Sequence, residues 1–326
     1  MKKRITWGAA VLLLLLTICA MRSAEELQLH CQSISLRYRQ PVAAAADAKS
    51  QPTFWTETTL TLQGKYHTTK SRVLLYSGDP TLVYGAPCQQ GGQPGPLDQT
   101  GCSISSVLAH QLYGSQNAVG VELRTQKKRY VVRGVFEDTQ ALALLPDGDA
   151  SFTAVELAMD DAAHQNPQDW VMQQLLACGL PTPDWILYLP EFAAVVSAFG
   201  WLPTVFGGVL LVAWLLRVYR NWTISARDIA VFFLLLVVAL LLPAFFSLWP
   251  QWLIPPRWSD FSWWGILGQQ LEQRRIDWLS MPPAGRDVIL KTTWFQQLAR
   301  TAGQCVLCEV LRCRLWRQRW QPETKQ

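Results

Sequence analysis

Residues 102–137 read CSISSVLAHQLYGSQNAVGVELRTQKKRYVVRGVFE, and they carry the clearest secondary-structure signals in the largest polar region of the chain. Apolar residues recur at helical spacing over Ser103–Tyr113, and Gly114 follows where a helix would end. Alternating apolar residues then predict strands over Val119–Arg124 and Tyr130–Glu137, joined by a short basic turn. The stretch therefore predicts a helix followed by a β-hairpin.

The glycines of this stretch have local conformational reasons. Gly114 is expected in the left-handed conformation that closes a helix, and Gly120 at the start of a strand. Gly134 falls inside a strand, which is typical of a bulge or of a close approach by another backbone. We therefore expect these residues to serve the fold rather than chemistry.

Two more strands are predicted before this stretch. Thr56–Leu62 alternates with period two, as a half-buried strand does, and Arg72–Tyr76 follows as the next strand after a turn at Gly64. Pro87–Gly101 is rich in glycine and proline and predicts a loop. The pattern up to residue 137 is thus mainly β.

A second helix is predicted after the hairpin, over Asn166–Cys178. Its apolar residues Val171, Leu175 and Leu176 are expected to point inward. Together with the strands, it makes residues 23–189 an α+β domain that is long enough to bury a core of its own.

Three apolar runs flank this domain, at Val11–Ala20, Val195–Leu216 and Ile229–Leu248. The last two approach the roughly 20 residues that a helix needs to cross a bilayer. The first is shorter and follows the basic residues 2–4, so we expect an uncleaved membrane anchor, with a cleaved signal peptide as the alternative. The fold class is therefore an α+β domain plus transmembrane helices.

Basic residues set the expected orientation. Residues 2–4 and the loop residues Arg217, Arg220 and Arg227 are expected in the cytoplasm, which places the α+β domain outside the cell. Residues 24–189 hold 11 Lys and Arg against 16 Asp and Glu, and the remainder holds 18 against 8, which gives the net charge of +5. The basic excess belongs to the membrane flanks and does not indicate nucleic-acid binding.

The remainder of the chain is harder to place. Trp and Phe crowd Ser247–Trp264, which predicts an interfacial segment on the outer face of the membrane that continues as an amphipathic helix at Gln269–Ile276. An aromatic cage for a cation is the alternative.

Val288–Leu311 is a candidate fourth crossing despite three charged residues, and an interfacial helix in the basic tail is its alternative. The predicted parts are an N-terminal transmembrane anchor at 1–22, the extracytoplasmic domain at 23–189, transmembrane helices 2 and 3 at 190–248, the outer interfacial segment at 249–287, and the candidate fourth crossing with a cytoplasmic tail at 288–326.

Cysteine spacing leaves two readings open. Cys88 and Cys102 bracket the Gly/Pro-rich loop in the outside domain, where a disulfide would persist, but independent thiols fit the spacing as well. Cys305, Cys308 and Cys313 have no fourth metal ligand nearby, so we expect no zinc site.

Motifs for chemistry are missing from the sequence. It contains no nucleotide-binding G-x-x-x-x-G-K-[ST], no G-x-S-x-G and no H-E-x-x-H. Asp160, Asp161 and His164 are expected to be solvated charges near a helix start. We expect no catalytic, cofactor-binding or metal-binding residues and no enzymatic activity.

Three short motifs in residues 102–137 give this stretch a family resemblance. They comprise Leu112, Tyr113 and Gly114; then Val119 and Gly120; then Val132, Gly134 and Val135. With these residues in this order, the stretch resembles the extracytoplasmic (periplasmic) core domain of MacB-like ABC permeases, within the FtsX-like permease superfamily. That family typically has Phe where Tyr113 stands and Pro where Ala118 stands.

The resemblance implies a permease-like membrane subunit without its own ATPase. Such a subunit would pair with a separate cytoplasmic ABC ATPase, form a homo- or heterodimer in the lipid bilayer, and transmit ATP hydrolysis to the outside domain, for mechanotransmission or export. Arg217, Arg220, Trp222 and Arg227 would then contact the ATPase. For the arginines, anchoring at the cytoplasmic face alone is an equal alternative.

A different class of function stays open. The chain could instead be a membrane-anchored extracytoplasmic binding or sensory domain whose helices only hold it in place. A receptor of this kind would bind a ligand through its outside domain and would leave ATPase activity unchanged.

Overall fold

The structure is a computed structural model that describes residues 15–23, 25, 27, 31–44, 52–160, 166–198, 200, 228, 231–232, 235–236, 239, 257, 259, 261–282 and 284–317. The chain forms two compact units. One, the sheet unit, comprises Leu29–Pro190 and Pro255–Gly285. The second unit comprises Met1–Gln28, Glu191–Ile254 and Arg286–Gln326. The sheet unit thus takes in much of the segment that the sequence assigned to the outer membrane surface.

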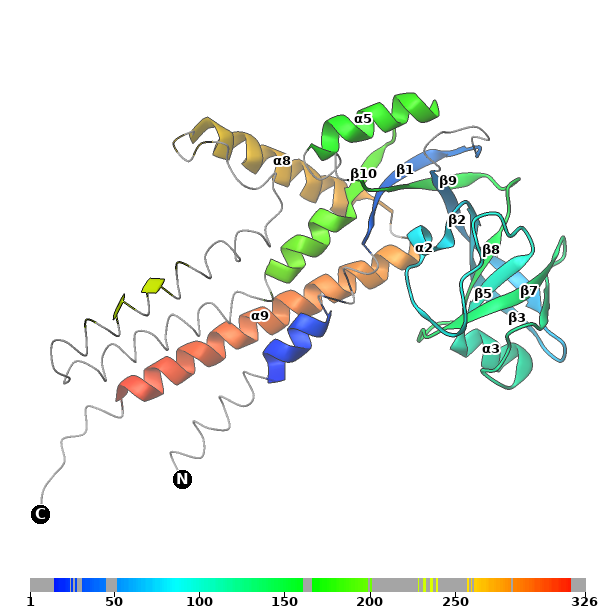
Figure 1. The fold of residues 1–326 in the computed structure, drawn as a ribbon, viewed down its shortest axis with the longest axis horizontal. Helices are drawn as coiled ribbons and strands as arrows, with labels where there is room; N and C mark the ends of the chain where they lie inside the picture. Colours follow the sequence, from blue (N-terminus) through cyan, green and yellow to red (C-terminus); the bar gives the residue numbers. More distant parts are fainter. Residues whose placement is uncertain are drawn as a thin grey trace, which may run out of the picture. The chain divides into compact units, whose positions relative to one another are not determined.

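A single sheet of ten strands forms the sheet unit (Figure 1). The strands are β1 (Ser33–Val42), β2 (Thr53–Gln63), β3 (Thr68–Ser77), β4 (Cys88–Gly91), β5 (Gly101–Ser105), β6 (Glu122–Arg124), β7 (Arg129–Phe136), β8 (Leu142–Pro146), β9 (Phe152–Ala158) and β10 (Trp185–Tyr188). Their order is β10-β1-β9-β2-β3-β8-β5-β7-β4. The pairs β3–β8 and β5–β7 are parallel, and the other pairs are antiparallel.

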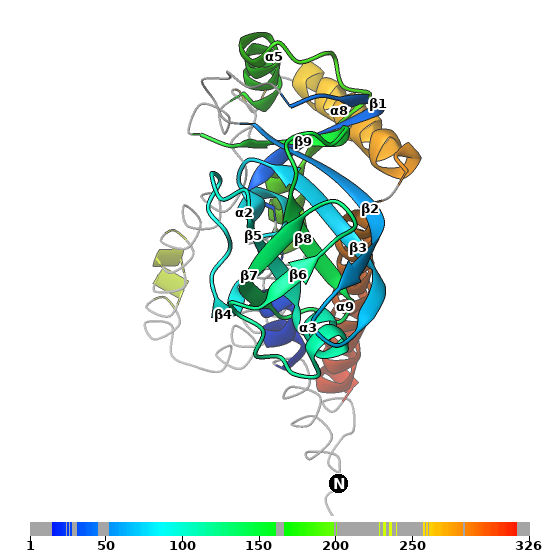
Figure 2. The ribbon, with the colours of Figure 1, turned by 90° about the vertical axis from the view of Figure 1, so that its right-hand side faces the viewer.

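The longest hairpin joins β2 and β3, which pair from Phe54 opposite Ser77 to Gln63 opposite Thr68. In the second half of β2, Thr59, Thr61 and Gln63 are exposed while Leu60 and Leu62 are half-buried and buried, the alternation of a pleated strand. The strands predicted at Thr56–Leu62 and Arg72–Tyr76 are therefore confirmed. The short strand β6 pairs with both β2 and β7, so this part of the sheet curls back on itself (Figure 2).

Four helices pack against the sheet (Figures 1 and 2). They are α2 (Pro80–Val83), α3 (Ser106–Tyr113), α5 (Pro167–Cys178) and α8 (Phe261–Ser280). Helix α3 packs on β3, β5, β7 and β8, while α8 lies against β10. The expected α+β class is confirmed for this unit.

The helix predicted at Asn166–Cys178 is confirmed as α5. Asn166 caps its first turn, and Gly179 ends it at φ 62° in the left-handed region. Val171 and Leu175 are buried as expected. Leu176 is 85% exposed, so its predicted inward direction was wrong.

Two boundaries near the motif were also wrong. The first residues of the helix predicted at Ser103–Tyr113 belong to β5, and the helix itself begins at Ser106. Every residue of β5 is buried, and a fully buried strand has an apolar run that periodicity does not separate from a helix. The loop predicted at Pro87–Gly101 contains the edge strand β4, which pairs with β7.

The helix predicted at Gln269–Ile276 is longer than expected and spans all of α8.

Three hydrophobic clusters form the core of the sheet unit. The first lies under α3 and contains Leu108, Leu112, Leu123 and Val132. The second packs α5 on β1 and β9, and the third joins α2 to β2, β3 and β8. Each cluster thus fixes one group of helices on the sheet.

The second unit is helical in its described residues. Residues 15–23 and 191–198 are helical, and α9 (Gly285–Arg317) continues into this unit from Arg286. Gln297 Nε2 donates to the carbonyl of Ala20 at 3.4 Å, and Arg300 donates to Ser23 Oγ at 2.6 Å. The predicted segment Val288–Leu311 lies within α9 and is helical, but α9 lacks the apolar character of a membrane-crossing helix, so the candidate fourth crossing is not confirmed.

Within the part of the chain that the structure describes, no helix combines the length and apolar character needed to cross a membrane. The predicted crossings at Val195–Leu216 and Ile229–Leu248 lie almost wholly outside the described residues. Most of Ser247–Trp264 also lies outside them, whereas residues 15–20 of the run Val11–Ala20 are described and helical.

Candidate functional site

The motif residues lie around α3 and the strands beneath it. Leu112, Val132 and Val135 are buried in the first cluster. Tyr113 donates from its hydroxyl to the carbonyl of Glu122 at 3.0 Å, which ties α3 to β6. These residues therefore join the helix to the hairpin that follows it.

The caps of α3 explain how this helix is positioned. Gly114 has φ 71° and its N–H donates to the carbonyl of His110, so it ends the helix as predicted. At the other end, Ser105 Oγ accepts from Leu108 N at 3.2 Å and from Leu142 N at 3.0 Å. Ser105 thus fastens α3 to β8 in addition to capping it, a role that the sequence analysis missed.

Gly134 lies where the backbone and a side chain approach β7 closely. A Cβ atom at this position would lie 2.6 Å from both Cys88 Sγ and the carbonyl oxygen of Gly92. The β5–β7 ladder is also irregular beside it, between Cys102 and Ser103. The predicted close approach is therefore confirmed.

Gly120 does not begin a strand. It lies in a turn at φ 82°, and its N–H donates to the carbonyl of Val132 at 2.7 Å, two residues before β6 starts at Glu122. The preceding Val119 is exposed. The strand predicted from Val119 therefore begins three residues later.

Cys88 and Cys102 are free thiols. Strand β7 separates them, with Cys88 opposite Phe136 and Cys102 opposite Val132. Two strand spacings place their Cα atoms about 10 Å apart or more, which exceeds the reach of a disulfide. Burial raises the pKa of both thiols. The bridge is therefore wrong, and the alternative of independent thiols describes the structure.

A buried carboxylate joins three strands in the core of the sheet. Glu156 on β9 is fully buried and accepts hydrogen bonds from Ser33 Oγ at 2.5 Å, Ser35 Oγ at 2.7 Å and Trp55 Nε1 at 2.9 Å. The Arg37 guanidinium lies 4.4 Å from the centre of the Trp55 ring. Because a buried carboxylate is costly without partners, this network specifies how β1, β2 and β9 associate.

The most distinctive polar arrangement lies on β2 and β3. Glu57 and Arg72 are diagonal neighbours on these strands, since Arg72 pairs with Thr59. Arg72 Nε donates to Glu57 Oε1 at 2.7 Å, and the side chains are only 28% and 21% exposed. The Arg72 guanidinium also donates to Gln140 Oε1. The ion pair is therefore held on both sides and partly shielded from water.

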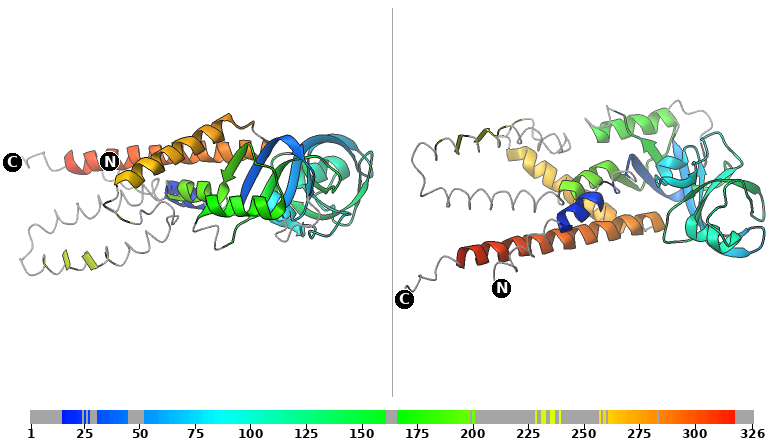
Figure 3. Two further views of the ribbon diagram at one scale, coloured as in Figure 1. Left: turned by 90° about the horizontal axis from the view of Figure 1, so that it is seen from above. Right: turned by 60° about the horizontal axis from the view of Figure 1, so that its bottom comes forward.

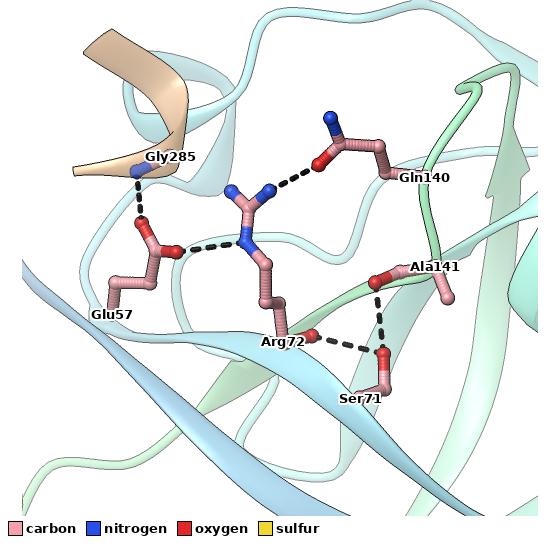
Figure 4. Close-up of polar contacts among 6 residues, drawn as sticks. All are labelled: Glu57, Ser71, Arg72, Gln140, Ala141 and Gly285. Carbon is pink, nitrogen blue, oxygen red and sulfur yellow. Dashed lines mark hydrogen bonds and ion pairs between the residues drawn. The ribbon is translucent and has the colours of Figure 1, made fainter. Parts of the chain in front are cut away.

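This ion pair holds the first residue of α9 (Figure 4). The backbone N–H of Gly285 donates to Glu57 Oε2 at 2.6 Å. A carboxylate at this point satisfies one of the free N–H groups of the helix start and favours its positive dipole end. We call Glu57, Arg72, Gln140 and Gly285 the Gly285 cluster.

Gly285 approaches the arginine too closely for any side chain. A Cβ atom built there would collide with a terminal nitrogen and the Cζ of Arg72. The neighbouring Ser71 Oγ donates to the carbonyl of Ala141 at 2.9 Å, which links β3 to the residue after Gln140 (Figure 4). The cluster is thus a fitted attachment point between β3, the loop before β8 and the start of α9.

The chemistry of the Gly285 cluster is that of a structural attachment. It pairs one carboxylate with one guanidinium, and its hydrogen bonds join two strands, a loop and the start of a helix. Across the described residues, no group of three or more His, Cys, Asp or Glu side chains gathers in a way that would hold a metal ion.

A second feature of the sheet unit is a cleft of about 290 Å³ beside β10. It is lined by Gln168 of α5, by Trp185 and Tyr188 of β10, and by Gln270 and Arg274 of α8, among others. The Arg274 guanidinium lies 4.4 Å from the centre of the Tyr188 ring. This cleft offers aromatic and charged groups to a small polar ligand.

The predicted ATPase-contact residues Arg217, Arg220, Trp222 and Arg227 lie outside the described residues. Of the three residues predicted to be solvated charges near a helix start, Asp160 is described, whereas Asp161 and His164 are not. The Gly285 cluster was missed, although the predicted strands contained both Glu57 and Arg72. No local signal in the sequence pointed to a partner at residue 285.

No family model matches the chain, and no curated protein matches it. Among solved structures, it is similar to the periplasmic region of MacB from Actinobacillus actinomycetemcomitans, with 12% identity and a TM-score of 0.42 over 52% of this chain and 94% of that one.

Two further solved structures are similar. The extracellular domain of the noncanonic ABC-type transporter YknZ from Gram-positive bacteria has 12% identity and a TM-score of 0.36 over 46% of this chain and 97% of that one. A domain of a putative permease protein from Porphyromonas gingivalis has 17% identity and a TM-score of 0.33 over 46% and 85%.

Proposed function

We propose that this chain is a permease-like membrane subunit of an ABC transporter complex, in which ATP hydrolysis by a separate cytoplasmic ATPase moves the extracytoplasmic sheet unit. Two features of the sequence support this proposal: the motifs in Cys102–Glu137 that resemble MacB-like permeases, and the apolar runs that flank the domain. The single observation that carries it is the attachment of Gly285 to Glu57 and Arg72.

The attachment matters because α9 is one unbroken helix of 33 residues (Figure 3). A helix of that length measures about 50 Å and moves as a rigid element. A displacement of α9 along its axis would therefore reach Gly285, and the hydrogen bond to Glu57 would pass it to β2 and β3. The proposed output is a movement of the sheet, for mechanotransmission or export.

The proposed partners are the membrane, a second permease subunit and the ATPase. The subunit would work in the plasma membrane as a multi-pass protein, as a homo- or heterodimer, with residues 24–189 outside the cell. Arg217, Arg220, Trp222 and Arg227 are proposed to meet the ATPase on the cytoplasmic side. The subunit itself would bind no cofactor and catalyse no reaction, because ATP hydrolysis belongs to the partner.

The experiment is reconstitution of the full chain with the ABC ATPase that co-purifies with it. A Glu57→Ala/Arg72→Ala double variant should retain the ATPase but change its turnover several-fold toward that of the ATPase alone. The control is Glu122→Ala/Arg124→Ala, which removes an exposed ion pair on β6 at 2.9 Å. Equal turnover for wild type, variant and control would contradict the coupling role of the Gly285 cluster.

A second candidate function is favoured by the cleft beside β10. An anchored receptor would bind a polar ligand there through Tyr188 and Arg274, whose side chains face each other at the cleft. Under this alternative, Arg274→Ala would abolish ligand binding by the full chain, and no ATPase would co-purify. Co-purification of an ATPase whose turnover depends on this chain would contradict it.

A further inference from the structure

The cleft beside β10 has charged groups of both signs in its lining. Arg274 contributes a guanidinium, and Asp184 and Asp277 contribute carboxylates. A ligand with a single sign of charge would be repelled by one of these groups, an anion by the aspartates and a cation by the arginine. The lining therefore favours a ligand that carries both charges.

The two signs of charge lie toward opposite ends of β10. The Arg274 guanidinium lies 4.4 Å from the centre of the ring of Tyr188, the last residue of the strand. Asp184 comes directly before Trp185, the first residue of the strand. The guanidinium and this carboxylate are thus separated along the length of the cleft.

Helix α8 repeats this separation of charge. Trp185 Nε1 donates to Ser280 Oγ at 3.3 Å, while Arg274 lies at the other end of the strand, so α8 runs antiparallel to β10. Asp277 follows Arg274 by about one helical turn and therefore lies toward the Trp185 end. Both carboxylates are displaced from the guanidinium in the same direction.

Both carboxylates keep the capacity to accept further hydrogen bonds. Asp184 accepts from Arg39 N at 2.8 Å, and the Arg39 Nε lies 3.8 Å from its second oxygen, with side chains that are 71% and 38% exposed. Asp277 accepts from Gln273 Nε2 at 3.0 Å. A carboxylate has about four acceptor positions, and an exposed ion pair of this length contributes little, so an ammonium group can bind here as well.

The separation of the charges indicates the length of the ligand. Asp184 and Tyr188 are four residue steps apart, which is about 13 Å in a strand. An extended dipeptide measures about 7 Å between its termini, and each terminus lies about 3 Å from a hydrogen-bonding partner. Two residues therefore fill this span, whereas a single amino acid is too short.

The volume of the cleft agrees with this length. A cavity of about 150 Å³ holds one benzene molecule, so the cleft of about 290 Å³ has room for about twelve non-hydrogen atoms, the size of a small dipeptide. Gln168, Gln270 and Gln273 offer amide groups that both donate and accept, as a peptide bond requires. Trp185 and Ile186 add apolar surface for the side chains of the ligand.

We propose that the cleft beside β10 binds a dipeptide with free termini. Its carboxylate pairs with Arg274, its ammonium group with Asp184 and Asp277, and its peptide bond lies among the glutamine side chains. The inference rests on the second candidate function, because it uses the same cleft and names the class of ligand. It requires neither a membrane nor an ATPase.

Isothermal titration calorimetry of the purified full chain with alanyl-leucine tests the proposal. Two capped forms examine the ends of the ligand separately, because N-acetyl-alanyl-leucine lacks the ammonium group and alanyl-leucine amide lacks the carboxylate. We expect each cap to weaken binding about tenfold, since it removes a hydrogen bond between charged groups. Leucine alone should bind more weakly than the dipeptide.

Variants assign each end of the ligand to its partner. Arg274→Ala should remove the preference for the free carboxylate over the amide, and Asp184→Asn/Asp277→Asn the preference for the free amine over the acetylated form. The control is Arg275→Ala, which removes the same charge from the next position of α8, where the exposed Arg275 pairs with Glu272. Both preferences should stay unchanged in the control. They are ratios of affinities in one preparation, so a partial loss of folded protein does not alter them.

The outcomes separate this inference from the proposed permease function. Absence of alanyl-leucine binding, equal affinity for free and capped dipeptides, or leucine binding as tight as that of the dipeptide would overturn the dipeptide site. Unchanged preferences in the cleft variants would overturn it too. ATPase turnover of the reconstituted complex is measured with the same chain. Turnover that does not depend on the chain contradicts only the permease proposal, whereas the binding data decide only the ligand of the cleft.

Discussion

Gly285 donates its backbone N–H to Glu57 Oε2 at 2.6 Å across 228 positions of sequence. Glu57 in turn pairs with Arg72, whose guanidinium occupies the space that a side chain at residue 285 would need. The start of a long helix is thereby fixed to the longest hairpin of the sheet. Replacing Gly285 is the most direct structural test of this attachment.

Gly285→Ala should loosen the attachment. The new Cβ displaces the Arg72 guanidinium and so weakens its bonds to Glu57 and Gln140, at a cost of about 1–3 kcal/mol. Hydrogen–deuterium exchange of peptides from the start of α9 and from β2 should accelerate. Gly303→Ala, on the same helix but with open space around it, is the control and should leave exchange in β2 unchanged.

Gly134→Ala should destabilise the motif region. Its Cβ would meet the Gly92 carbonyl and Cys88 Sγ at 2.6 Å, so backbone as well as side chain must shift, with an expected loss of about 1–3 kcal/mol. Gly148→Ala has no atom within 4 Å of the added Cβ and should be close to neutral. Thermal unfolding of the two variants compares them, and equal midpoints would show that the packing around Gly134 is looser than described.

Ser105→Ala should cost about 1–3 kcal/mol, because it removes the cap of α3 and leaves the buried N–H of Leu142 without its acceptor. Ser115→Ala, which removes an exposed bond to Asn117 N, should cost less. Unfolding by urea measures the difference. A loss at Ser105 no larger than that at Ser115 would mean that the link from α3 to β8 contributes nothing.

Oxidising conditions should not join Cys88 to Cys102. β7 lies between the two strands that carry them, and burial raises the pKa of both thiols, which disfavours the reactive thiolate. Peptide mapping without reductant should recover both as free thiols, and the thermal midpoint should not change when reductant is added. A recovered 88–102 disulfide peptide would contradict the strand order.

Asp98 should give the fold a dependence on acid pH. It accepts from the backbone N–H groups of Thr100 and Gly101 and pairs with Arg133 at 3.1 Å, and the hydrogen bond from Thr100 is the largest cause that lowers the pKa of its carboxyl group. A lowered folded pKa contributes stability above the unfolded value of about 3.9, and this is lost as pH falls through the folded value.

The Asp98→Asn variant should therefore be less stable than wild type at pH 7, and the gap should narrow below about pH 4. Thermal midpoints of both proteins between neutral and acid pH measure this. A gap that stays constant over the whole range would show that the charge of Asp98 is not what stabilises the loop.

The sequence predicted the elements whose signals are local. The hairpin strands around Gly64, the cap at Gly114, the close approach at Gly134 and the helix after Asn166 each follow from a few neighbouring residues. The residues of these elements constrain the local backbone conformation directly, so contacts with the rest of the fold did not change the predicted secondary structure.

The failures have tertiary causes. β4 forms because it can pair with β7 at the edge of the sheet. Ile104 lies in a strand because that strand pairs with β7 on one side and with β8 on the other. The Gly285 cluster joins residues that are far apart in sequence, and nothing near Glu57 or Arg72 indicates which segment they hold. Long-range pairing of this kind is invisible to periodicity.

The central claim is that the sheet unit responds to an ATPase carried by another polypeptide. Hydrogen–deuterium exchange of the reconstituted complex, with and without a non-hydrolysable ATP analogue, tests it at β2, β3 and the first turn of α9. The account predicts that nucleotide changes exchange in all three segments together, and that Glu57→Ala/Arg72→Ala confines the change to α9. Identical exchange with and without nucleotide, in a complex whose ATPase binds the analogue, would contradict it.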